Sequence, residues 1–501
     1  MTSPAWAAHL PPGVAPEGVD LLVDRSLARS WTRRWAEDGD RRVVHDGHAG
    51  WVTAAQLEER SRAIARRLAG AGLVRGDRMV LSAPASLDLV VAHVAALRLG
   101  LVVVPMNTAY TEREVAHVVR DARPAAAVVD DMRRARWITD AAPSSRIVLT
   151  GPDVTLPRGV MAPSLDAVDS GDPALLVYTS GTTGPPKGAL LSHGNLLASA
   201  EAVRLAWRWS PDDALVLALP LFHVHGLGVG LHGTLTAGAA VVLRSSFAVD
   251  DILDAAASHH ASLFFGVPTM YARLAASSRV AELHALRLCV SGSAPMAADL
   301  HAAIARLTGQ RVLERYGMSE TVMNVSNPYD GERRAGTVGL PLPHVDVRLD
   351  APSGEIHLRG PNVFERYWER PDATAEAFDA DGWFHTGDVG DFDEDGYLRI
   401  VGRRKELIIS GGYNVYPREI EDVLRAHPGV EDAAVIGVPD PEWGERVVAY
   451  IEGGAAADDV VAFAATRLAG YKRPRDVRVV DRLPRNALGK VLKDQLPGVA
   501  R

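Results

Sequence analysis

The chain has 501 residues, a net charge of −8 at neutral pH, 47% hydrophobic residues and 23% charged residues. These values are typical of a soluble globular protein of about two to four domains, and the negative charge gives no support to a nucleic-acid partner. The single cysteine, Cys289, excludes a disulfide framework and a cysteine-based metal site, and its apolar surroundings predict a buried, inert thiol.

The N-terminal sequence argues against export and membrane insertion. Its first residues, MTSPAWAAHLPPGVAP, lack the basic start and apolar run of a signal peptide. The most apolar region, residues 88–105, is broken by His93, Arg98 and Gly100 before it reaches the length of a membrane span. We therefore expect a cytoplasmic protein without a membrane partner.

Strand and helix patterns alternate through about the first 400 residues. A helical pattern at 54–72 ends on glycines, as many helices do. Short runs of Val, Leu and Ala predict buried strands at 78–84, 101–107, 125–130, 146–151, 214–220, 239–245, 261–268 and 286–292. This alternation predicts an α/β fold of mostly parallel sheets flanked by helices.

The composition changes near residue 402, where the charged stretch GRRKELIISGGYNVYPREIEDVL begins. A helix is expected to open at Pro417, followed by strands in EDAAVIGVP and RVVAYIEGG and a helix in DDVVAFAATRLAG. We predict a large N-terminal domain over 1–403 and a small, mobile α+β domain over 404–501.

The loop YTSGTTGPPKG, residues 178–188, joins a predicted strand to a segment that contains a helix. Its glycines allow backbone N–H groups to converge on an anion, its hydroxyls add donors, and Lys187 adds a positive charge. These features favour a phosphate-binding loop over an exposed flexible turn. Two prolines separate Gly184 from Lys187, so the loop is not of the Walker type.

The loop resembles the phosphate-binding signature of adenylate-forming enzymes: acyl-CoA synthetases, adenylation domains of peptide synthetases and firefly-type luciferases. PLFHVHG, SGSAPM, YGMSET, HTGD, the pair Gly402-Arg403 and RLPRNALGKVLK also match, in the family's order, and together the matches span about residues 20–495. Taken singly, each of these residues has an ordinary structural explanation. The combination identifies the chain as a member of this superfamily.

The resemblance implies a nucleotide site, a metal site and a hinge. Tyr316 would stack on the purine, Asp388 would bind the ribose, Lys490 would be the catalytic lysine, and Lys405 would be the hinge. Glu320 would hold Mg²⁺ together with Thr183. The cofactor-binding residues implied are Thr179, Ser180, Gly181, Thr182, Thr183, Gly184, Lys187, Ser293, Ala294, Pro295, Glu314, Arg315, Tyr316, Gly317, Met318, Ser319, Asp388, Arg403, Gly411 and Gly412.

The implied reaction has two steps. A carboxylate attacks the α-phosphate of ATP, expels pyrophosphate and forms a mixed anhydride with AMP, while fixed donors and cations stabilise the charge that develops on the phosphate oxygens. The small domain then swings about Lys405, withdraws Lys490, and places the Gly411–Gly412 turn beside the pantetheine of coenzyme A.

Several segments, among them FHVHGLGVGLHGTLTAGA and ERYGMSETVMNVSNPY, closely resemble malonyl-CoA synthetases. The implied acid is malonate or methylmalonate. Its second carboxylate needs a cation or several donors, and the candidates are Arg273 and Arg315, with His223 as a lesser one. Either arginine could instead form a structural ion pair. His223, near the carboxylate to be activated, would be catalytic, and Val224, Ser291 and Met323 would complete the acid site.

Other functions remain open at this point. Within the class, the chain could be a short- or medium-chain, or an aryl, acyl-CoA synthetase. It could also be a luciferase-like monooxygenase, a carrier-loading adenylation domain, or a catalytically silent nucleotide-binding protein, although intact Lys490, Glu320 and Asp388 disfavour the last. No obligate protein partner is evident from the sequence.

Overall fold

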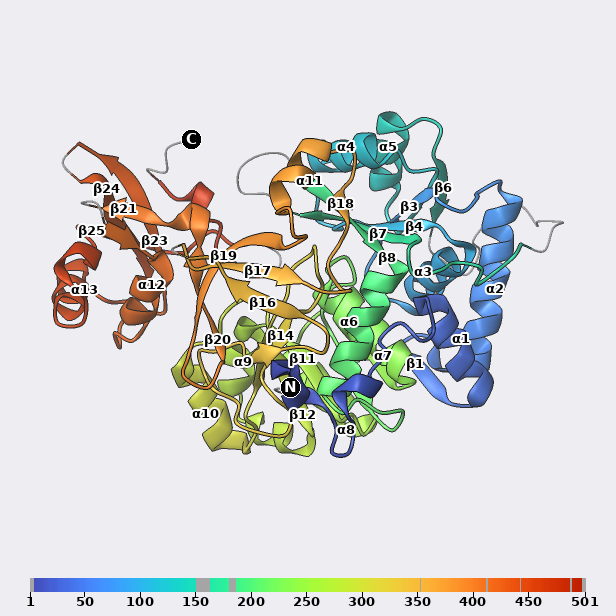
Figure 1. The fold of residues 1–501 in the computed structure, drawn as a ribbon, viewed down its shortest axis with the longest axis horizontal. Coiled ribbons are helices and arrows are strands. Elements are labelled where there is room, and N and C mark those ends of the chain that lie inside the picture. Colours follow the sequence, from blue (N-terminus) through green and yellow to red (C-terminus); the bar gives the residue numbers. More distant parts are fainter. Residues whose placement is uncertain are drawn as a thin grey trace. The chain divides into compact units, whose positions relative to one another are not determined.

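The computed structural model describes residues 4–149, 163–179, 186–351, 353–410, 413–441, 443–486 and 489–497. The chain forms two compact units. The first comprises Met1–Asp346 and Arg359–Gly382, and the second comprises Val347–Leu358 and Trp383–Arg501 (Figure 1).

The first unit contains a seven-stranded sheet in the order β18-β8-β7-β4-β3-β5-β6. Its strands are β3 (Arg78–Ser82), β4 (Val102–Pro105), β5 (Ala126–Val129), β6 (Arg146–Leu149), β7 (Pro173–Thr179), β8 (Lys187–Ser192) and β18 (Arg366–Tyr367). The strands from β7 to β6 run parallel, whereas β8 and β18 are each antiparallel to their neighbour. Helices α4 (Glu112–Ala122) and α5 (Met132–Ala141) pack their apolar residues against this sheet.

A nine-stranded sheet forms the rest of the first unit's framework, in the order β15-β14-β13-β12-β11-β9-β10-β1-β2. Its strands are β1 (Arg42–Asp46), β2 (Gly50–Thr53), β9 (Ala214–Leu217), β10 (Ala240–Leu243), β11 (Leu263–Gly266), β12 (Leu288–Ser291), β13 (Leu313–Tyr316), β14 (Val325–Ser326) and β15 (Leu340–Pro341). Its central strands are parallel, and antiparallel pairs lie at both ends. Helices α8 (Val249–Ser258), α9 (Pro268–Ala275) and α10 (Ala298–Thr308) pack on it.

Six more α-helices lie in the described residues of the first unit. They are α1 (Leu27–Glu37), α2 (Ala54–Gly70), α3 (Leu87–Leu99), α6 (His193–Ala206), α7 (His232–Ala237) and α11 (Pro371–Ala377). Helices α3 and α6 are buried along nearly their whole length. The predicted strands and the mostly parallel sheets flanked by helices are therefore confirmed.

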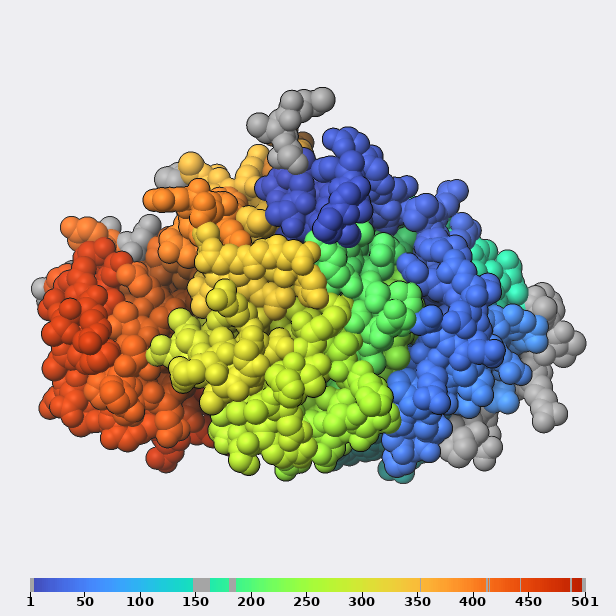
Figure 2. Space-filling view, turned by 90° about the horizontal axis from the view of Figure 1, so that it is seen from below, coloured from blue at the N-terminus to red at the C-terminus, as the bar shows by residue number. Residues whose placement is uncertain are grey.

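The N-terminal segment is tied to the middle of the chain within the first unit. His9 Nε2 lies 3.1 Å from the carbonyl oxygen of Leu340, and the Arg208 guanidinium donates to the carbonyls of His9 and Leu10. In the space-filling view the dark-blue N-terminal segment accordingly lies against yellow and green residues (Figure 2). Cys289 is fully buried as predicted, and burial raises the pKa of its thiol to about 12.

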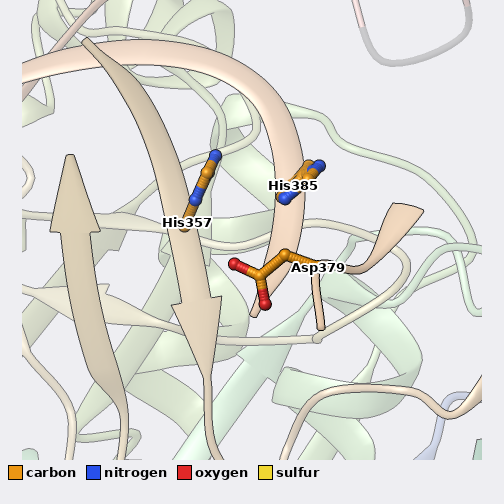
Figure 3. A group of neighbouring side chains, drawn as sticks. All are labelled: His357, Asp379 and His385. Atoms are coloured by element: carbon orange, nitrogen blue, oxygen red, sulfur yellow. The ribbon is translucent and has the colours of Figure 1, made fainter. Parts of the chain in front are cut away.

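The second unit contains two sheets. The first is a four-stranded sheet of β16 (Asp346–Leu349), β17 (Glu355–Arg359), β19 (Phe384–Phe392) and β20 (Leu398–Arg403). His357 on β17 and His385 on β19 are register partners, and their rings stack with centroids 4.3 Å apart (Figure 3). Figure 3 also labels Asp379, which belongs to the first unit.

The other sheet of the second unit has five strands. They are β21 (Ile408–Ser410), β22 (Tyr413–Val415), β23 (Asp432–Asp440), β24 (Gly444–Glu452) and β25 (Asp476–Val480). Helices α12 (Pro417–Arg425) and α13 (Ala457–Ala465) pack on one side of this sheet, and α12 opens at Pro417 as predicted. Leu483 and Leu496 pack against residues of β23 and β24, so both ends of the segment that carries Lys490 lie against this sheet. The predicted boundary at 403/404 falls between the two sheets and stays a prediction.

None of the helices in the described ranges is long and apolar enough to cross a membrane.

Candidate active site

The two ends of the predicted phosphate loop lie side by side. Thr179 ends β7 and pairs with Lys187, the first residue of β8, in an antiparallel register. The Thr179 hydroxyl donates to the Lys187 carbonyl at 3.4 Å. The loop residues Ser180, Gly181, Thr182, Thr183 and Gly184 lie outside the described residues.

Glu320 lies in a turn after β13 and is buried, with 6% of its surface exposed. Its carbonyl accepts a hydrogen bond from the backbone N–H of Phe364 at 2.9 Å. The hydroxyl of Tyr367 donates to its carboxylate Oε1 at 3.0 Å. The predicted metal-binding carboxylate is therefore held by a segment some 45 residues away in sequence, which the sequence analysis did not identify.

The carboxyl ends of β12 and β13 bring the predicted adenine and acid segments together. These strands are parallel, with Ser291 in register with Glu314. The Glu314 carboxylate accepts hydrogen bonds from the backbone N–H groups of Met296 and Gly336, at 3.1 and 3.3 Å. Glu314 therefore holds the Ser293-Ala294-Pro295 segment in place, and Ser293 itself has a positive φ of 69°.

Arg315 is a buried cation without a hydrogen-bond partner for Nε and Nη2 among the described residues. A Cβ atom at Gly292 would lie 2.3 Å from its Cζ, so the guanidinium rests directly on the backbone of that glycine. Burial lowers the pKa of Arg315 to about 9. An unpaired buried cation is costly, so this arrangement favours an anionic ligand.

Other unpartnered polar atoms are buried in the same part of the first unit. Ser291 Oγ and His225 Nε2 have no hydrogen-bond partner in the described part of the chain. His225 Nδ1 lies 3.1 Å from Ser293 Oγ. Burial, and then the positive charge of Arg315, hold the pKa of His225 well below its usual range. His225 was not predicted, although its place two residues after His223 in PLFHVHG was an available signal.

His223 precedes the π-helix η3 (His225–Leu231), and its ring lies 4.7 Å from that of Phe222. Burial lowers the pKa of His223 to about 4, so the imidazole is neutral at neutral pH. Val224 is half-buried, and Met323 is fully buried.

The two candidate arginines have different surroundings. Arg273 lies on α9, is exposed, and stacks over the ring of Phe247 at 4.9 Å. Arg315 is buried with 6% of its surface exposed. Among the described residues, Arg315 Nε and Nη2 are buried without a hydrogen-bond partner, and a buried carboxylate would satisfy them.

The purine segment follows β13. Tyr316 is 9% exposed, and its hydroxyl lies 3.8 Å from the Met318 sulfur. The backbone of Gly317 lies against the backbone of Val322, since a Cβ at Gly317 would lie 2.0 Å from the Val322 carbonyl oxygen. Val322 has a φ of 59°, which is rare for a β-branched residue, so the turn that carries Ser319 and Glu320 is conformationally strained.

The second unit gathers its own predicted residues. Asp388 on β19 is buried and is paired with Arg403 on β20, with Oδ1 3.1 Å from Nε. Lys405 is exposed in the short turn Arg404–Glu406. Partial burial, and then the charge of Arg403, lower the pKa of Lys490 to about 8, against the opposing effect of Glu406. Gly411 and Gly412 lie outside the described residues.

The chain matches known proteins over almost its whole length. The AMP-binding enzyme family matches residues 31–368, and the AMP-binding enzyme C-terminal domain matches residues 419–490. A feruloyl-CoA synthase of Amycolatopsis sp is 39% identical over 481 residues, covering 91% of this chain and 94% of the relative. A malonate–CoA ligase of Arabidopsis thaliana is 35% identical over 481 residues, covering 86% and 79%. The crystal structure of ATP-bound MatB from Rhodopseudomonas palustris superposes with a TM-score of 0.88 at 39% identity, covering 93% and 97%.

Proposed function

Because the chain belongs to the AMP-binding enzyme family and is an AMP-forming acyl-CoA ligase, we propose that it ligates a small dicarboxylate, malonate or methylmalonate, to coenzyme A. The observation that carries the proposal is the buried guanidinium of Arg315, whose Nε and Nη2 have no hydrogen-bond partner among the described residues. A dicarboxylate brings one carboxylate to be activated and another to pair with this cation.

The free-energy cost of an unpaired buried charge distinguishes monocarboxylates from dicarboxylates. A monocarboxylate such as butyrate would leave either Arg315 or its own carboxylate unpaired in a buried site, at a cost of several kcal/mol. A dicarboxylate satisfies both, and Ser291 Oγ and His225 Nε2 offer further hydrogen bonds nearby. Sites built around such polar groups reject ligands that lack the matching group.

The relatives support the class of reaction more firmly than the identity of the acid substrate. The malonate–CoA ligase agrees with a dicarboxylate, whereas the feruloyl-CoA synthase agrees with an aryl acid. An aryl acid is therefore the second candidate. Its single carboxylate would be used for activation, so no second anion would remain to pair with Arg315.

In the proposed mechanism the phosphate loop and Lys187 hold the β- and γ-phosphates of ATP, and Tyr316 stacks on the adenine. Glu320 fits a magnesium site because it offers a buried carboxylate oxygen, the ligand type that this ion prefers. Bound there with a loop hydroxyl such as Thr183, Mg²⁺ would neutralise phosphate charge. The chain's own contribution is to orient this carboxylate.

Lys490 is proposed to stabilise the negative charge on the α-phosphate during adenylation. With a pKa of about 8 it is largely protonated at neutral pH. His223, neutral at this pH, would orient the attacking carboxylate as a hydrogen-bonding group. For thioester formation, a turn about Lys405 would withdraw Lys490 and admit coenzyme A.

The test is kcat/KM for malonate, methylmalonate, acetate, butyrate, benzoate and ferulate, from pyrophosphate release, with the mass of each thioester. We expect malonate or methylmalonate to exceed butyrate by at least about 100-fold, because a site whose buried polar groups are left unpaired discriminates by up to roughly 10⁴- to 10⁵-fold. Equal or better turnover of butyrate, benzoate or ferulate would assign the protein to another acyl-CoA synthetase class.

A further inference from the structure

The segment 361–368, PNVFERYW, contacts two separate parts of the proposed nucleotide site. We propose that its Tyr367 is a positioning residue that orients the Glu320 carboxylate for the metal and keeps it apart from Lys187. This inference rests on the proposed roles of Glu320 and Lys187, and it adds a residue to them.

The segment is fastened to the turn that carries Glu320. The Asn362 side-chain amide donates to the carbonyls of Thr321 and Met323, at 3.0 and 2.8 Å. The Phe364 N–H donates to the Glu320 carbonyl at 2.9 Å. Asn195 on α6 in turn donates to the carbonyls of Pro361 and Val363, both at 2.8 Å, so the segment is itself anchored.

The same segment is also fastened to the strand that begins at Lys187. Tyr367 on β18 is the register partner of Ala189 on β8. The Trp368 N–H donates to the Gly188 carbonyl at 2.7 Å. The position of Tyr367 is therefore fixed by backbone hydrogen bonds to both structures that it links.

The side chain of Tyr367 links a cation to an anion. Its hydroxyl donates to Glu320 Oε1 at 3.0 Å, and the Lys187 ammonium lies over its ring, 5.3 Å from the centroid. Within the described ranges Lys187 has no ion pair with a carboxylate. The ring of Phe364 packs edge-on against Tyr367, with centroids 4.8 Å apart, and fixes the ring plane.

This arrangement has a consequence for ligand binding. Lys187 is exposed and Glu320 is buried, and a salt bridge between these opposite charges would have to be broken before ATP and metal could bind. With Tyr367 in place, the cation rests on an aromatic face and the carboxylate on a hydroxyl. The Tyr367 hydroxyl holds the Glu320 carboxylate by Oε1 in a fixed orientation.

Two substitutions separate the two contacts. Tyr367→Phe removes the hydroxyl and keeps the ring under Lys187, whereas Tyr367→Leu removes both. Tyr450→Phe is the matched control, because it removes a buried phenol hydroxyl that is bonded to Pro497 and Arg478 in the second unit. Circular dichroism and thermal melting establish that each variant is folded.

The primary measurement is Mn²⁺ binding to the enzyme with a saturating non-hydrolysable ATP analogue, followed by electron paramagnetic resonance. We expect Tyr367→Phe to raise the Kd for Mn²⁺ roughly 10-fold, as loss of a group that orients a metal ligand typically does. The Kd for the analogue should change less than threefold, as should turnover of a preformed acyl-adenylate by coenzyme A. Tyr367→Leu should in addition weaken analogue binding, and Tyr450→Phe should change neither.

An unchanged Mn²⁺ affinity in folded Tyr367→Phe would overturn the inference, as would an equal loss of Mn²⁺ and analogue binding. Glu320→Gln separates this failure from that of the proposed function. If Glu320→Gln binds Mn²⁺ as tightly as the wild type, the proposed metal ligand is wrong, and the inference falls with it. If only Glu320→Gln is impaired, Tyr367 alone is wrongly assigned. None of these measurements requires the acid, so they are independent of the malonate assignment.

Discussion

Replacing Arg315 by methionine should make the ligand-free protein more stable and a poorer malonate ligase. Burial lowers the pKa of Arg315 from its ordinary value to about 9. This difference corresponds to a free-energy cost of about 5 kcal/mol for keeping the charge in the folded protein. The unfolded chain has the higher pKa, so the cost is fully present below pH 9 and is lost as the pH rises toward the ordinary value.

Methionine is nearly as long, is apolar, and needs no partner. We expect Arg315→Met to raise the free energy of unfolding of the ligand-free protein by about 1–4 kcal/mol at pH 7. The same change removes the partner of the second carboxylate. Loss of one member of a buried charge pair costs about 2–5 kcal/mol, which lowers kcat/KM for malonate by roughly 30- to 5000-fold. The kcat/KM for butyrate should not fall, because butyrate has no second carboxylate that loses its partner.

The assay combines urea unfolding of the ligand-free protein with pyrophosphate release for malonate and butyrate. Arg273→Met is the comparison, because it removes the other candidate arginine at an exposed position. If Arg315→Met leaves malonate turnover unchanged, or if Arg273→Met produces the loss instead, the assignment of the carboxylate to Arg315 is refuted. Destabilisation of the ligand-free Arg315→Met protein would refute the energetic reasoning.

Three further predictions test other parts of the account. Gly292→Ala places a methyl group 2.3 Å from the Arg315 Cζ, so it should displace the guanidinium. The kcat/KM for malonate should fall at least about 10-fold and that for butyrate should not, so equal losses of kcat/KM for the two acids would contradict this prediction. Lys490→Ala should lower pyrophosphate release by roughly 100- to 1000-fold, and the variant should still convert a preformed adenylate. In the wild type, the adenylation rate should fall as the pH rises through about 8, because Lys490 loses its proton there. Lys405→Pro should spare adenylation and reduce thioester formation at least about 10-fold, so an unimpaired second step would place the hinge elsewhere.

The sequence predicted those parts of the fold that local pattern determines. Buried parallel strands are continuous Val, Leu and Ala runs, so β3 to β6 and β9 to β12 could be identified. The four-stranded sheet of the second unit was not predicted. Its strand β17 reads EIHLR, and because the buried residues Glu355 and His357 are polar, the strand lacks a continuous apolar run.

The site was predictable only in part, because several of its relations depend on folding. Arg273 and Arg315 are equivalent as residue types, and only burial distinguishes them. The hydrogen bond between Tyr367 and Glu320 joins residues 47 positions apart, through the pairing of a two-residue strand with β8. No periodicity or motif spacing encodes such a contact.

The central claim, that Arg315 makes this enzyme a dicarboxylate ligase, is tested most directly by one competition experiment. The wild-type enzyme is given ATP, limiting coenzyme A and equal concentrations of malonate, methylmalonate, butyrate and ferulate, and the thioesters are quantified by mass spectrometry. Their ratio is the ratio of kcat/KM values. We predict that malonyl-CoA and methylmalonyl-CoA together exceed butyryl-CoA and feruloyl-CoA by at least about 100-fold. A product mixture in which butyryl-CoA or feruloyl-CoA is equal or dominant would contradict the claim.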